Sequence, residues 1–210
     1  MKNLITLISL IALCCGTGNP KFDEDHAFEY LLKQCEFGPR NPSSDGYYKC
    51  LNFMITELEQ TADDLIIQEF SYQERKNRTR HDLHNVIARY NPDAEFQTII
   101  SCHWDTRPWA DSEPNRKDRD QPILGANDGA SGVAVLLELA KIFGENPPPI
   151  GVNLVFFDGE VIPGKGCRIT AYVENFFRFS FCDFKNLFFC PFPRRVYNNS
   201  MKSLFLWQFL

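Results

Sequence analysis

Apolar and polar positions repeat with helical spacing in some stretches of residues 24–160 and with strand-like spacing in others. Helices are predicted at 24–34, from the capping pair Ser43 and Ser44 through Leu58, and from Val133 to Gly144. Strands are predicted at 65–72, 84–90, 98–102 and 152–157. Because strand, helix and strand alternate in the second half of this stretch, the pattern predicts an α/β fold with a mainly parallel central sheet flanked by helices.

Polar residues follow two of the predicted strands directly. His103-Trp104-Asp105 comes after 98–102, and Asp158-Gly159-Glu160 comes after 152–157. Between them, Asp128 lies in the small-residue stretch 125–132, just before the long apolar helix. Ligands in α/β sheets bind beyond the carboxyl ends of the strands, so we expect these groups to converge there.

Each group also has a simpler interpretation when it is taken alone. Asp128 or Ser131 could cap the following helix, His103 could be a hydrogen-bonded histidine at a strand end, and Asp158 and Glu160 could form a polar turn. Their joint occurrence at strand and helix ends favours a site over three unrelated structural roles. Such a site suits zinc, with His103 and Asp128 as ligands. Asp105 would orient a ligand, and Glu160 would act as general acid and base.

The same residues carry a family resemblance. His103-Trp104-Asp105, the stretch 125–132 and Phe156-Phe157-Asp158-Gly159-Glu160 resemble the zinc-dependent M28 peptidase family. Within it, the chain is most similar to the glutaminyl-peptide cyclotransferase (glutaminyl cyclase) branch. The resemblance covers roughly residues 24–160, with supporting likenesses at 37–40, Asn85-Val86 and 107–111.

The resemblance implies a function and assigns residues to it. Asp128 matches the family's zinc-binding aspartate and Glu160 its catalytic glutamate, while Asp105 and Asp158 match supporting positions. His103 matches a histidine that binds metal in the two-zinc aminopeptidases and need not do so in the single-zinc cyclases. The implied reaction cyclises the N-terminal glutamine of a peptide or protein to pyroglutamate and releases ammonia. The alternatives are an M28 metallo-aminopeptidase and an inactive fragment or binding module.

The chain also departs from the family pattern. Val161 occupies the position of a second acidic zinc ligand, and no histidine follows His103. Ten of the 19 phenylalanines lie in 161–210, where neither helical nor alternating spacing persists. We therefore expect a partial domain over 24–160, with an incomplete C-terminal half. We interpret 161–210 as an aberrant tail of out-of-frame or intronic origin, and we expect this chain to bind zinc poorly or not at all.

The N-terminal residues predict export. Lys2 and the short apolar run Leu4–Ala12 are typical of a signal over residues 1–18, ending in cleavage or in lipid attachment at Cys14 or Cys15. Cys35 and Cys50 could form a disulfide across the intervening turn, with Cys102 buried in a strand. A net charge of −5 and the lack of a basic stripe disfavour nucleic-acid binding.

Overall fold

The computed structural model describes residues 20–73 and 78–159, and all statements about structure refer to these residues. The signal at 1–18, Glu160, Val161 and the tail 161–210 lie outside them. The helices are α2 (Glu24–Glu36), α3 (Asp45–Glu59) and α4 (Ser131–Glu145), with a short 3₁₀ turn at Arg116–Asp118. The strands are β1 (Asp64–Gln73), β2 (Arg80–Tyr90), β3 (Gln97–His103) and β4 (Gly151–Phe157).

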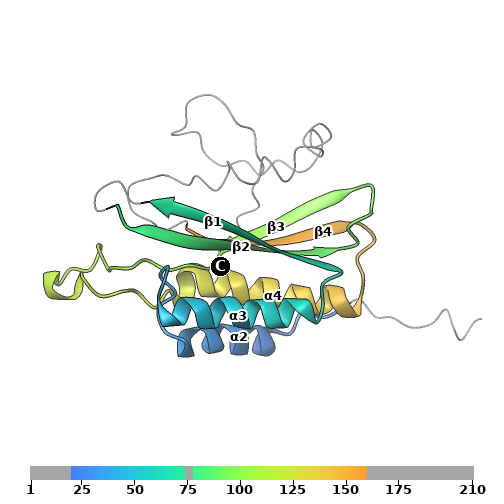
Figure 1. Ribbon diagram of the computed structural model, residues 1–210. Coiled ribbons are helices and arrows are strands. Elements are labelled where there is room, and N and C mark those ends of the chain that lie inside the picture. The colour runs from blue at the N-terminus through green and yellow to red at the C-terminus, as the bar shows by residue number, and fades with distance from the viewer. Residues whose placement is uncertain (1–19, 74–77, 160–210) are drawn as a thin grey trace, which may run out of the picture.

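The four strands form one sheet in the order β1-β2-β4-β3. The β1–β2 and β2–β4 pairs are antiparallel, and β3 and β4 form the parallel pair that the strand–helix–strand pattern predicts. Figure 1 shows the three helices gathered on one face of this sheet. The α/β class is confirmed, and the described part of the sheet is mixed.

The main core lies between the helices and the sheet. Every residue of β4 is buried, because this central strand has neighbours on both edges and α4 below it. Val133, Leu137 and Ala140 of α4 bury their side chains in this core. At the start of α4, Gly132 permits close packing on β3, since a Cβ at this position would lie only 2.8 Å from the Cβ of Cys102.

Two local expectations are settled by the fold. Ser44 caps α3 as predicted, because its side chain accepts a hydrogen bond from the backbone N–H of Tyr47 at 3.1 Å. The Cys35–Cys50 disulfide is wrong, since both residues are free thiols. Cys102 lies on β3 as expected, but it is half-buried rather than fully buried.

Gly46 provides a test of the packing between α3 and the turn before it. A Cβ at this position would lie 2.7 Å from the carbonyl oxygen of Phe37 and would also clash with that of Pro39. Gly46→Ala is therefore expected to lower the free energy of unfolding by about 1–3 kcal/mol, as overpacking does. Chemical denaturation measures this change. The control Asn52→Ala, on the exposed side of α3, should change it by less than about 0.5 kcal/mol; equal effects would contradict the packing.

Candidate metal and acid–base site

The site lies where β3 and β4 end side by side. His103, the last residue of β3, is the register partner of Phe157, the last residue of β4. Beyond them, the backbone N–H of Trp104 donates to the carbonyl of Phe157 at 3.0 Å. Asp158 therefore follows at the same edge of the sheet as His103. The predicted convergence at the carboxyl ends of the strands is present for these two residues.

His103 contacts two aspartates through its two ring nitrogens. Nε2 lies 3.0 Å from Oδ1 of Asp128, and Nδ1 lies 3.2 Å from the backbone oxygen and 3.5 Å from Oδ1 of Asp105. His103 and Asp105 are buried, whereas the Asp128 side chain is 53% exposed. Asp105 thus holds the imidazole through Nδ1, and Nε2 faces the half-exposed carboxylate of Asp128. This is the arrangement of a ligand oriented by a supporting carboxylate.

Asp128 is placed by a sharp bend immediately before α4. Its own ψ is 99°, and Gly129 has φ 99°, a left-handed value that favours glycine. A Cβ on Gly129 would lie 3.3 Å from Cε1 of His103 and 3.2 Å from the backbone oxygen of Asp105. Glycine therefore lets the bend approach the histidine closely. The helix-cap interpretation of Asp128 and Ser131 is wrong, because Ala130 is the N-cap of α4 and no side chain caps it.

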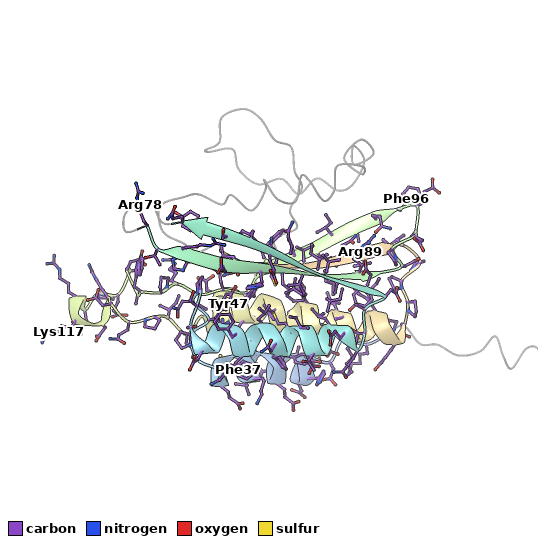
Figure 2. All side chains as sticks on the ribbon, in the orientation of Figure 1. Phe37, Tyr47, Arg78, Arg89, Phe96 and Lys117 are labelled. Carbon is purple, nitrogen blue, oxygen red and sulfur yellow. The ribbon has the colours of Figure 1, made fainter. Side chains whose placement is uncertain are left out.

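Asp158 is fully buried and hydrogen-bonded to groups from two other elements. Its Oδ2 accepts from the Tyr47 hydroxyl at 2.5 Å and from the backbone N–H of His84 at 2.7 Å. The Asp158 N–H donates to Oδ1 of Asn85 at 2.9 Å. In Figure 2, Tyr47 lies near the N-terminal end of α3, beneath the sheet. Three hydrogen bonds thus fix the chain where it leaves β4.

Burial shifts the pKa values of Asp158 and Tyr47. Desolvation, together with the nearby Asp105 carboxylate, holds the pKa of Asp158 well above its ordinary value. Burial and then the charge of Asp158 raise the pKa of Tyr47, so the tyrosine stays protonated and its hydroxyl donates a hydrogen bond to the Asp158 carboxyl group. Within the described residues, Oδ1 of Asp158 has no hydrogen-bond partner.

Arg40 is a completely buried cation beside the site. Its guanidinium donates to the carbonyls of Trp104, Leu124 and Gly125 at 3.1, 2.9 and 2.8 Å. Burial lowers the pKa of Arg40, whereas nearby groups, among them the Asp105 and Asp128 carboxylates, act in the opposite direction. The guanidinium therefore lies within electrostatic reach of two site carboxylates while its hydrogen bonds go to backbone.

The described residues provide an incomplete metal site. Within residues 20–73 and 78–159, no group of three or more His, Cys, Asp and Glu side chains is placed to hold a metal ion. His103 Nε2 and Asp128 Oδ1 are two facing donors, and a catalytic zinc takes three protein ligands. Glu160, the predicted general acid and base, lies outside the described residues. These donors alone therefore do not fit a catalytic zinc ion.

Sequence reasoning missed the contributions of Tyr47, His84 and Arg40. Tyr47 belongs to a helix far from the strand ends in sequence, and His84 contributes only a backbone N–H. No local pattern reports either contact. Arg40 lies in the stretch 37–40 and Asn85 in the pair Asn85-Val86, so both were marked by the family likeness, but their partners were not predictable.

Comparison with known proteins finds relatives of this chain in both sequence and structure. The model of Peptidase family M28 matches residues 85–167. A glutaminyl-peptide cyclotransferase of Drosophila melanogaster is 38% identical over 127 residues, which cover 58% of this chain and 33% of that protein. The chain thus spans a third of the length of this curated relative.

Two solved structures resemble the fold. Bacteroides thetaiotaomicron glutaminyl cyclase bound to N-acetylhistamine is 35% identical, with a TM-score of 0.65, and the match covers 71% of this chain and 52% of that one. A Zn-dependent exopeptidase from Parabacteroides distasonis is 32% identical, with a TM-score of 0.67 and coverage of 70% and 50%. Both likenesses extend over about half of the solved chain.

The raised pKa of Asp158 predicts a pH-dependent stability. Above the ordinary carboxyl pKa the unfolded state releases this proton while the folded state keeps it, so the wild type loses stability as pH rises. Asp158→Asn removes this pH-dependent contribution to the free energy of unfolding. The free energy of unfolding of the variant, relative to that of the wild type, should therefore rise with pH by at most about 1.4 kcal/mol per pH unit. Denaturant unfolding from about pH 4.5 to 7 measures this difference.

Asp111→Asn is the control for this measurement, because the Asp111 side chain is 54% exposed. Its stability profile should run parallel to that of the wild type. A parallel profile for Asp158→Asn as well would contradict the assigned burial effect.

Proposed function

The chain is M28-like and, within that family, glutaminyl cyclase-like, and from this premise we propose that it derives from a zinc-dependent glutaminyl-peptide cyclotransferase. Such an enzyme cyclises an N-terminal glutaminyl residue to pyroglutamate and releases ammonia. The substrate would be the N-terminus of a peptide or protein. The whole activity is a proposal, because the chain covers a third of its curated fly relative.

The observation that carries the proposal is the contact between His103 and Asp128. A buried imidazole held by Asp105 faces a half-exposed carboxylate at 3.0 Å, at the carboxyl end of a parallel strand pair. A metal held at this edge would be accessible from solvent through Asp128. The Zn-dependent exopeptidase that resembles the chain supports zinc as the metal.

The described donors are too few for a complete zinc site. Each of the chain's own site residues would have a limited role. His103 and Asp128 would supply two ligands, Asp105 would orient the imidazole, and Asp158 would fix the exit of β4, after which Glu160 follows. Glu160 would transfer the proton between the α-amine and the leaving ammonia. We propose that this chain binds zinc poorly or not at all and is an impaired cyclase.

An aminopeptidase is the second candidate. The exopeptidase from Parabacteroides distasonis and the glutaminyl cyclase resemble the fold to a similar degree, with TM-scores of 0.67 and 0.65. His103 beside Asp128 would also suit a two-zinc site with an activated water. The products distinguish the two reactions: a cyclase leaves the peptide bond intact, and an aminopeptidase releases a free amino acid.

We also propose that the protein is exported, on the basis of the predicted signal over residues 1–18. The signal would end either in cleavage or in attachment of a lipid anchor at Cys14 or Cys15. Among the helices of residues 20–73 and 78–159, none is long and apolar enough to cross a bilayer.

The purified chain is expected to hold well under one zinc ion per molecule after dialysis against buffered zinc. The reason is that its described residues provide only two facing donors. Metal analysis measures the stoichiometry, and ammonia release from a glutaminyl peptide measures turnover. One zinc per chain together with cyclase turnover would show that the proposed impairment is wrong.

The family function is tested by a hybrid in which residues 20–159 are followed by the C-terminal half of the Bacteroides thetaiotaomicron cyclase. We expect about one zinc per chain and pyroglutamate formation. Asp128→Asn should lower zinc affinity more than about 100-fold, since it removes a ligand rather than a supporting group.

Asp111→Asn is the matched control in this hybrid, because Asp111 and Asp128 expose 54% and 53% of their side chains. This control should leave zinc affinity unchanged. A hybrid that binds zinc but releases free N-terminal amino acids would replace the cyclase proposal with the aminopeptidase one. A hybrid that folds yet has no zinc-dependent activity would favour an inactive binding module.

A further inference from the structure

The bend that carries Asp128 is held at both ends by buried side chains from the N-terminal part of the chain. Before the bend, Arg40 donates to the carbonyls of Leu124 and Gly125 at 2.9 and 2.8 Å. After it, Nε2 of Gln34 donates to the carbonyl of Ala130 at 3.1 Å. Arg40 and Gln34 are both 0% exposed. The two contacts therefore lie in the interior, where competition from water is small.

The bend needs such support because its own backbone is irregular. Gly125 and Gly129 have φ values of 62° and 99°, and Asp128 is extended rather than helical. The backbone N–H of Ala130 donates to the carbonyl of Gly125 at 3.2 Å across the bend. The Asp128 side chain is half exposed, so packing does not fix it. Its position therefore depends on how the flanking backbone is held.

Arg40 also reaches the segment that carries His103 and Asp105. Its Nε donates to the carbonyl of Trp104 at 3.1 Å, and its backbone N–H donates to the Thr106 hydroxyl at 2.8 Å. One planar guanidinium thus joins the exit of β3 to the start of the bend. Lysine could not reproduce these directions, because its ammonium lacks the rigid fork of donors.

The contacts of Arg40 join the two backbone segments that carry His103 and Asp128. A buried charge has a desolvation cost, and an apolar side chain would fill the same space at lower cost. What Arg40 adds is fixed geometry: its three carbonyl partners come from the two segments that meet at His103 and Asp128. Nη2 also lies within 3.6 Å of where a Gly129 Cβ would be.

We propose that Arg40 and Gln34 are positioning residues that together hold the bend at Asp128 against His103. The role of His103 and Asp128 as site residues rests on the proposed function, whereas the positioning rests on the hydrogen bonds of Arg40 and Gln34 to the bend.

The test uses the chain labelled with ¹⁵N at its four histidines, with the His103 signal assigned by His103→Asn. Arg40→Lys and Gln34→Met remove the guanidinium fork and the amide donor with little change in volume. In the wild type, the ring nitrogen signals of His103 should differ from those of an exposed histidine, because both nitrogens face oxygen acceptors of Asp105 and Asp128. In both variants these shifts should move toward the averaged values of an exposed histidine.

Two control variants match the chemistry at sites away from the bend. Arg89→Lys removes a guanidinium that pairs with Asp64 at 3.0 Å. Gln60→Met removes an amide that donates to the carbonyl four residues earlier, as Gln34 does to Tyr30. Both controls should leave the His103 signals unchanged.

Several outcomes overturn the proposal. Unchanged His103 signals in the metal-free Arg40→Lys and Gln34→Met proteins would do so, and so would equal shifts in the controls. Loss of the folded spectrum in both bend variants would also do so, because it would give these side chains a global rather than a local role.

Discussion

The parallel pairing of β3 with β4 is the interaction on which the site depends. Because the two strands run in the same direction and in register, His103 and Asp158 leave the sheet at one edge. An antiparallel pairing would have placed them at opposite edges. The α4 helix connects the two strands and packs beneath them, which brings the bend at its N-terminal end to the same edge.

Around this edge, polar groups are arranged behind the exposed carboxylate. Asp105 holds the imidazole of His103, while Tyr47 and the backbone of His84 hold Asp158. Arg40 links the backbone segments on either side of the gap between His103 and Asp128. Most buried polar groups in proteins are hydrogen-bonded. Here these hydrogen bonds hold the backbone and side chains on the buried side of the edge at which Asp128 is half exposed.

Much of the fold followed from periodicity. The long apolar run after Asp128 is α4, and the β-rich run before Asp158 is the fully buried β4. These elements were predictable because burial on one or both faces leaves a direct trace in residue spacing. The free thiols of Cys35 and Cys50 were not, because residue type alone does not say whether two side chains meet. The antiparallel pairs β1–β2 and β2–β4 depended on tertiary packing as well.

The sequence by itself determined the order of the elements and the motifs at their ends. His103, Asp128 and Asp158 each follow or precede an apolar run that had to be buried, so their place at element ends was fixed locally. Only the tertiary structure decided their partners. Hydrogen bonds such as Tyr47 to Asp158 and Arg40 to Gly125 join residues 111 and 85 positions apart. Such contacts form only when the sheet and helices have packed, and therefore no spacing in the chain records them.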